Sequence, residues 1–176
     1  MKAILVGVTL TLVALVGGGS AYLLLGLAEV RADIPPPQWE VRLMKAALHA
    51  SVKREAPEIQ NPVAPTSANL AVGEKSYLDS CSTCHGTPGQ PFDGQGPVLY
   101  PPAPEFPLVG TDYTEAQIFW VARHGIRRTG MLAHGMQVTD EDLWAIAAYI
   151  QHLRSLPPAR QAFLVKPGEG HQKIQR

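Results

Sequence analysis

The chain has 176 residues, of which 45% are hydrophobic and 17% are charged, so it has room for one modest domain with accessory segments. Its 15 Lys and Arg residues balance 15 Asp and Glu residues, which excludes binding to nucleic acid or to an anionic membrane through net charge and leaves only local patches for contact with partners. Two cysteines are too few for the disulfide framework of a small secreted protein.

Segment 1–27 is expected to be a membrane anchor. No charged residue occurs from Ala3 to Leu27, and roughly 25 residues at about 1.5 Å each would cross the ~30 Å hydrocarbon core as a helix. Lys2 favours a cytoplasmic N-terminus, which places the rest of the chain on the periplasmic or other extracytoplasmic side. The alternative is a signal peptide cleaved after Val30-Arg31-Ala32, although the apolar run exceeds the about 7–15 residues of a signal core. In both interpretations the rest of the chain is exported from the cytoplasm.

Segment 28–68 is predicted to be a proline-rich stalk that contains one short helix. The prolines of "DIPPPQW" stop the first helix, and "EAPEIQNPVAPTSAN" is polar and spaced by prolines, which favours an extended chain. A helix over Trp39–Ala56 would lie between them. We expect it to pack on its own domain or to rest at the membrane interface with Trp39 as an anchor. The alternative is that it docks a partner subunit.

Residues 69–156 have the pattern of a helical domain. A helix over Leu70–Ser80 places Gly73, Tyr77 and Cys81, which are four residues apart, on one face. A second helix is expected to start at Thr114, where "TEAQ" forms a capping box, and to stop at Gly125.

A third helix is expected to begin at Thr139, before three acidic residues, and to end before Pro157. Its apolar residues follow the helical period and predict a buried stripe: Leu143, Ile146, Ala147, Ile150 and Leu153. No segment has a convincing strand pattern. The predicted fold class is therefore all-α, with three main helices and a C-terminal tail over residues 157–176.

The segment between the first two helices of the domain is long and rich in glycine and proline. Loops of this length are uncommon inside compact domains, and three short helices give little core of their own. The segment nevertheless contains several apolar residues: Phe92, Val98, Leu99, Tyr100, Phe106 and Leu108. We therefore expect these side chains to surround a large buried ligand.

The stretch "CSTCHG", residues 81–86, contains both cysteines. A closed zinc site needs four ligands, and distant histidines such as His124 or His134 would have to complete it. A thioredoxin-like redox pair belongs to a fold with strands. Attachment of a haem also accounts for the export signal, the preceding helix and the small core. In this interpretation Cys81 and Cys84 form thioethers with the haem and His85 coordinates its iron.

An electron-transfer haem has a second axial ligand, and a methionine thioether raises its reduction potential. The candidates in the stretch 124–136 are Met131, His134 and Met136. This stretch resembles the "G-I-x-x-T-G-M-P-A" loop of class I c-type cytochromes, in which the methionine after Thr-Gly is the distal ligand. The resemblance implies Met131. Leu132 stands where the family usually has proline, so Met136 and His134 stay open as alternatives.

The resemblance covers residues 69–156. In this family the first and last helices cross at a small residue and stack aromatic side chains there, which implies that Gly73 and Tyr77 meet Ile146 and Tyr149. The "GQGP" stretch is similar to the segment whose proline carbonyl accepts the Nδ1 proton of the proximal histidine. The resemblance therefore implies that Pro97 orients His85.

The function that the resemblance implies is that of an electron carrier. With His85 and Met131 on the iron, no small substrate reaches the metal, so we expect a membrane-tethered, single-pass cytochrome with one haem c and no enzymatic activity of its own. Its expected partners are redox proteins such as a respiratory complex, a dehydrogenase or an oxidase, with no nucleic acid. Two alternatives stay open: a fixed subunit of an oxidase or dehydrogenase complex, and a haem sensor or enzyme with a displaceable distal ligand.

Overall fold

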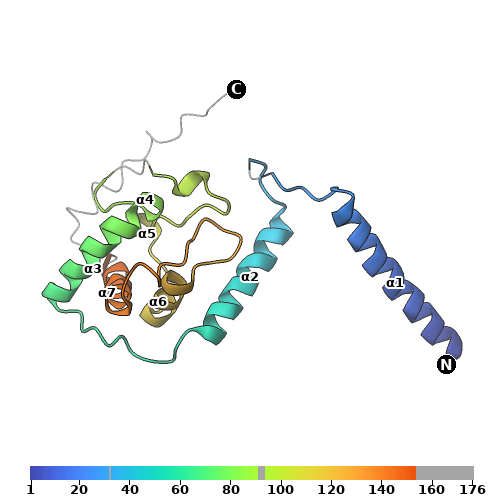
Figure 1. The fold of residues 1–176 in the computed structure, drawn as a ribbon, viewed down its shortest axis with the longest axis horizontal. Helices are drawn as coiled ribbons and strands as arrows, with labels where there is room; N and C mark the ends of the chain where they lie inside the picture. The colour runs from blue at the N-terminus through green and yellow to red at the C-terminus, as the bar shows by residue number, and fades with distance from the viewer. Residues whose placement is uncertain (32, 91–93, 154–176) are drawn as a thin grey trace, which may run out of the picture. The chain divides into compact units, whose positions relative to one another are not determined.

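The computed structural model describes residues 1–31, 33–90 and 94–153, and within them all regular elements are helical (Figure 1). This confirms the predicted all-α fold class. The chain divides into two compact units, Met1–Pro36 and Pro37–Arg176. The end of the predicted domain, 154–156, and the predicted tail, 157–176, lie outside the described residues, as does Phe92.

The first unit contains helix α1, Lys2–Leu24. It is 23 residues long, none of its side chains is buried, and its most apolar stretch has a mean hydropathy of 2.0. At about 1.5 Å per residue a helix of this length matches the ~30 Å core of a bilayer. A signal sequence has the same properties, so α1 is a candidate for either segment.

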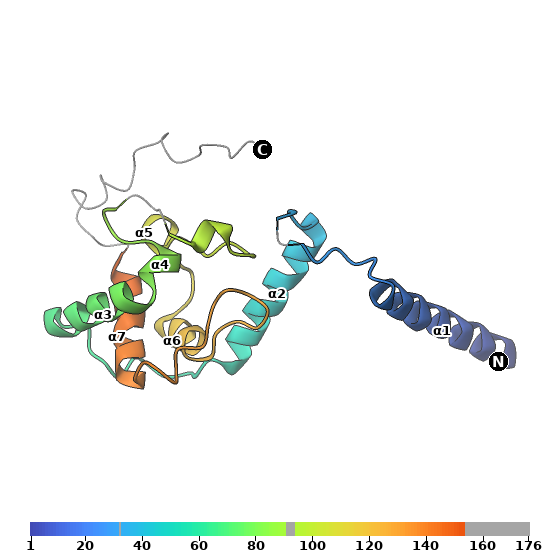
Figure 2. The same ribbon diagram turned by 45° about the horizontal axis from the view of Figure 1, so that its top comes forward.

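The core of the second unit is formed by α3, Ser67–Ser80, α6, Glu115–His124, and α7, Asp140–His152. Helix α7 packs against both α3 and α6 (Figures 1 and 2). Every residue from 143 to 150 is buried, so α7 is enclosed almost all round. The predicted apolar stripe of this helix is confirmed.

Helices α3 and α7 cross at a glycine. A Cβ atom on Gly73 would lie 2.2 Å from the carbonyl oxygen of Ala145 and 3.0 Å from the Cβ of Tyr149, so only glycine permits this approach. One turn further along α3, the ring of Tyr77 contacts the ring of Tyr149 with 5.4 Å between centroids. The predicted meeting of Gly73 and Tyr77 with the last helix is confirmed.

The helix starts are fixed by threonine caps. Thr114 accepts a hydrogen bond from the backbone N–H of Gln117, whose side chain accepts one from the backbone N–H of Thr114, so the predicted capping box is present. The Thr139 hydroxyl accepts the N–H of Asp142 at the start of α7. Thr66 caps α3, which therefore begins before the predicted Leu70.

In its described residues, 81–90 and 94–114, the long connection between α3 and α6 contains three short helical turns that the sequence pattern did not predict. They are α4, Ser82–His85, the 3₁₀ turn η1, Gly96–Val98, and α5, Phe106–Val109. Each is too short to show a helical period, and proline stands at the start of the second and third.

Helix α2, Gln38–Glu55, confirms the helix predicted over Trp39–Ala56. It packs on α6, and Val52 near its C-terminal end is fully buried. The His49 ring contacts the Tyr113 ring edge-on, with 5.2 Å between centroids. The helix thus packs on its own domain, as one of the two expected arrangements requires.

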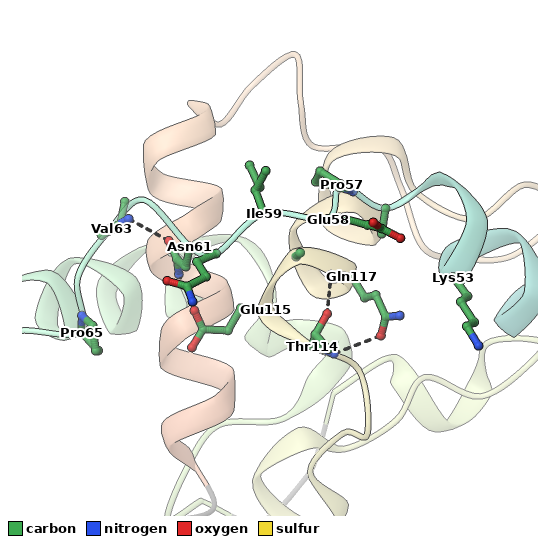
Figure 3. A pocket seen from close by; sticks show the side chains of 13 residues that line it. Lys53, Pro57, Glu58, Ile59, Asn61, Val63, Pro65, Thr114, Glu115 and Gln117 are labelled. Atoms are coloured by element: carbon green, nitrogen blue, oxygen red, sulfur yellow. Dashed lines mark hydrogen bonds between the residues drawn. The ribbon is translucent and has the colours of Figure 1, made fainter.

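The segment after α2 is attached to the core by Asn61. Its Nδ2 donates to Oε2 of Glu115 at 2.7 Å and to the carbonyl oxygen of Trp144 at 3.0 Å, and its Oδ1 accepts the N–H of Val63 at 2.8 Å. An open pocket of about 660 Å³ lies between residues 53–65 and the start of α6 (Figure 3). None of its lining residues belongs to the Cys-x-x-Cys-His motif.

Replacing Asn61 with alanine is expected to lower the free energy of unfolding by about 1–2 kcal/mol, since three hydrogen bonds are lost and a partly buried carbonyl and carboxylate lose their donor. Urea unfolding of the intact protein measures the loss. The exposed neighbour supplies the control, because Gln60→Ala should change stability by less than about 0.5 kcal/mol. Equal stability of the two variants would contradict the assigned role.

Candidate functional site

The Cys-x-x-Cys-His motif forms one turn of helix directly after α3. Cys81 ends α3 and begins α4, and its carbonyl oxygen accepts the N–H of Cys84 at 3.1 Å and of His85 at 2.9 Å. Residues three and four positions apart on a helical turn lie on the same side. The two thiols, which are free and half-buried, therefore share one side of the turn with the imidazole.

Tyr77 fastens the end of this turn to α3. Its hydroxyl donates to the carbonyl oxygen of Gly86 at 2.7 Å and lies 3.2 Å from that of His85, and the side chain is fully buried. Gly86 has φ +85°, a conformation that favours glycine and ends the turn. The tyrosine thus fixes the backbone that carries the imidazole.

The imidazole of His85 has a defined tautomer. A carbonyl oxygen only accepts, so Nδ1, which lies 2.8 Å from the carbonyl oxygen of Pro104, carries a proton. His85 is 8% exposed, and its ring stacks on the ring of Phe106 with 4.4 Å between centroids. Burial lowers the pKa of His85 and favours the neutral ring. Nε2 is then the nitrogen with a lone pair for a metal.

The acceptor of this hydrogen bond corrects one sequence expectation. The carbonyl of Pro97 was expected to accept the Nδ1 proton of His85, and in the structure the carbonyl of Pro104 accepts it. The N–H of Ala103 donates to the carbonyl oxygen of Gly96 at 3.0 Å. This bond closes residues 97–102 into a surface loop, with Pro97 exposed, and brings the second proline-rich stretch to the histidine.

The Cys81 thiol is protonated at neutral pH, because burial raises its pKa to about 12. Redox-active cysteines react as thiolates, which a thiol with this pKa does not supply. Within 1–31, 33–90 and 94–153, no three His, Cys, Asp or Glu side chains gather in a group that could hold a metal ion.

Met131 lies in a closed turn after α6. Gly125, with φ +66°, ends that helix, and a Cβ there would come within 2.7 Å of the Met131 carbonyl oxygen. That oxygen accepts the N–H of Ile126 at 3.0 Å. The hydroxyl of Thr129 accepts the N–H of Met131 at 3.0 Å and donates to the carbonyl of Ile126 at 2.8 Å. The threonine therefore fixes the backbone next to the methionine.

The three candidate distal ligands differ in burial. Met131 packs partly buried against the hydrophobic core, at whose edge Cys81 and Phe106 also lie. Met136 is 95% exposed. His134 is half-buried, and its backbone N–H donates to the carbonyl oxygen of Ala122 at 3.0 Å. Of the two methionines, Met131 is the one that the fold turns toward the core.

The loop that carries Met131 also meets the loop that follows the motif. A Cβ on Gly130 would lie 2.7 Å from Cδ1 of Leu99, so the two loops are in close contact. The donor set fits a haem c: two free thiols and an imidazole Nε2 share one helical turn, and a thioether is available on a separate loop.

Sequence patterns did not connect two residues with His85: Pro104, which was not singled out, and Phe106, which was expected only as one of the apolar residues around a ligand. Both follow "YPPA" in the long loop, where neither periodicity nor spacing singles out one proline or one aromatic residue. The available signal for the stack on His85 was the aromatic character of Phe106, which Phe92 and Tyr100 of the same loop share.

Residues 68–150 match the family described as cytochrome c oxidase, cbb3-type, subunit III. The chain is also similar to a thiosulfate dehydrogenase of Stutzerimonas stutzeri (strain A1501), with 29% identity over 114 residues that cover 60% of this chain and 34% of that protein. The chain thus spans about a third of the length of this relative.

Among solved structures, a chain of the Kuenenia stuttgartiensis reducing HAO-like protein complex aligns with 20% identity over 55% of this chain and 50% of that one. Its TM-score of 0.44 is too low for a structural argument.

Proposed function

Since the match over residues 68–150 supports a c-type cytochrome domain, we propose that this chain carries single electrons with one covalently attached haem c. Cys81 and Cys84 form the thioethers, and His85 and Met131 are the axial ligands, as in class I cytochromes. When bound, the haem supplies an iron that changes between the ferrous and ferric states.

The observation that carries the proposal is the fixed orientation of His85. The carbonyl of Pro104 holds its Nδ1, the ring stacks on Phe106, and the imidazole shares one side of the motif turn with the two thiols. A hydrogen bond to Nδ1 also increases the donor strength of the other nitrogen. With the Met131 thioether as the second protein ligand, a bound iron would have no position open to a substrate, which favours electron transfer over chemistry at the iron.

The cellular setting belongs to the same proposal. Helix α1 anchors the chain in the cytoplasmic membrane by a single span, and the cytochrome domain lies on the periplasmic or other extracytoplasmic side. Redox proteins donate and accept its electrons. Mass spectrometry of the membrane fraction tests the anchor, because the uncleaved chain retains residues 1–27.

A second candidate function is that of a fixed subunit in an oxidoreductase complex. It is favoured by the description of the matched family as an oxidase subunit and by the greater length of the thiosulfate dehydrogenase relative. Purification of the intact chain from membranes in mild detergent distinguishes the fixed subunit from the free carrier. A fixed subunit co-purifies with catalytic subunits in a constant ratio, and a free carrier does not.

The covalent attachment gives the first test. In the wild-type protein we expect the haem to stay on the polypeptide through denaturing electrophoresis and acidified acetone, because thioether bonds resist both. The double substitution Cys81→Ser with Cys84→Ser should release all of it. The exposed residue between the cysteines gives a matched control, as Thr83→Ser should retain the haem. A colourless, folded wild-type chain whose two thiols both react with a thiol reagent would overturn the proposal.

A further inference from the structure

Helix α2 has two apolar faces on opposite sides. At about 100° per residue, Val41, Leu48 and Val52 share the face that is buried or half-buried on the domain. The opposite face carries four exposed residues within an arc of about 60°. We name this set the outer stripe: Trp39, Leu43, Ala46 and Ala50.

The outer stripe has a large contact area that its own domain leaves uncovered. Trp39 is 66% exposed and Leu43 is 59% exposed. A tryptophan with aliphatic neighbours on one helix face is typical of helices that lie in the interface of a bilayer, where the ring has one apolar and one polar side. Six charged residues within α2 exclude a second membrane span.

The position of α2 in the chain limits what can cover the stripe. Only residues 25–37 separate it from α1, and thirteen residues reach at most about 45 Å when fully extended. If α1 is the anchor, as the proposed function holds, the start of α2 cannot move further than that from the bilayer. The outer stripe therefore always stays within reach of the membrane surface.

The charges of α2 agree with a lipid surface. Four basic residues against Glu40 and Glu55 give the helix a net charge of +2 (4 − 2), while the whole chain is neutral. Three of the basic residues flank the outer stripe: Arg42 and Lys53 lie on one side, and Arg54, whose guanidinium also pairs with Glu55 at 2.7 Å, lies on the other. Long basic side chains in this position reach lipid phosphates while their stems cover apolar surface.

We propose that the outer stripe of α2 lies on the surface of the membrane in which α1 is anchored, with its basic flanks on lipid phosphates. Because Val52 and the opposite face hold α2 on the domain, this contact gives the cytochrome domain one preferred orientation to the bilayer. The chain is then an oriented carrier at the surface and not a domain on a free tether. The inference rests on the proposed anchoring by α1.

The test uses the intact chain in nanodiscs made with ordinary or brominated phospholipids, since bromine on the acyl chains quenches nearby tryptophan. Trp144 is 5% exposed and Trp120 is half-buried in the domain. The tryptophan fluorescence of the wild type minus that of Trp39→Phe therefore gives the fluorescence of Trp39 alone. We expect brominated lipid to reduce that difference signal by at least half. An equal Trp39 signal in both lipids would overturn the inference.

Two neighbouring residues provide a matched pair of variants. Leu43 and Met44 are 59% and 58% exposed, but about 100° of helix rotation separates them and only Leu43 is in the outer stripe. Leu43→Gln should cut the quenching of Trp39 at least twofold, and Met44→Gln should leave it unchanged. Equal effects of the two variants would contradict a contact through the stripe.

The design separates failure of the anchor from failure of the surface contact. A chain that lacks residues 1–27 by mass spectrometry and does not enter nanodiscs overturns both the anchor and the contact. A full-length chain that enters nanodiscs, keeps its haem and shows no quenching of Trp39 overturns the contact alone. If the outer stripe became inaccessible to solvent only after a catalytic subunit was added, the membrane contact would also be overturned. The stripe would then belong to the interface with a protein partner.

Discussion

Replacing Gly73 with alanine is expected to lower the free energy of unfolding by about 3 kcal/mol, the upper end of the usual cost of overpacking. In an ordinary helix interior the same change is stabilising, by about 1 kcal/mol. The sign is reversed here because the added Cβ would lie 2.2 Å from the carbonyl oxygen of Ala145 and 2.7 Å from its carbonyl carbon. These are backbone atoms inside α7, which cannot turn away as a side chain could, so α3 and α7 must separate.

Urea unfolding of the haem-loaded protein measures this effect. Ala71→Ser adds one atom at an exposed position of the same helix and should change the free energy of unfolding by less than about 0.5 kcal/mol. Because Tyr77 lies one turn after Gly73 and holds the carbonyls of His85 and Gly86, we also expect Gly73→Ala to perturb the haem spectrum. A Gly73→Ala protein more stable than wild type would refute the close crossing.

The helices of the domain could be predicted because each carries its own local signals. The capping box at Thr114 and the cap at Thr139 mark helix starts within four residues of sequence, and the apolar period of α7 predicts one buried stripe of a helix that is in fact buried almost all round. The crossing at Gly73 was predicted only through the resemblance to class I cytochromes, since no local pattern pairs a glycine with a helix some seventy residues later.

The site could be predicted only in part, for the same reason. Three residues in one short motif identify the candidate thioethers and proximal ligand. The partners that hold the proximal ligand are distant in sequence, and they depend on how the loop folds. The bond from Ala103 to Gly96 shortens that loop and thereby selects Pro104 over Pro97. Likewise, α2 shows two apolar stripes in the sequence, and only contacts with α6 decide which is buried.

The substitution Met131→Leu is expected to lower the reduction potential by roughly 0.2 V, within the span of about 0.8 V that axial ligands cover. It should also abolish the weak long-wavelength band of methionine-ligated ferric haem and allow the ferrous protein to bind carbon monoxide. Leucine keeps the apolar volume of the partly buried side chain, so the change reports on the thioether and not on lost packing. Spectra and potentiometric titration measure all three effects.

The matched control is Met136→Leu, which removes the same atom from a side chain that is 95% exposed and should change neither the potential nor the spectrum. If Met136→Leu lost the band and Met131→Leu kept it, the ligand would be Met136, and the turn fixed by Thr129 would have a structural role only. If both variants kept wild-type spectra, His134→Gln would identify an imidazole ligand. Carbon monoxide binding by the wild-type ferrous protein would instead favour the sensor or enzyme alternative, because a displaceable distal ligand opens the iron to small molecules.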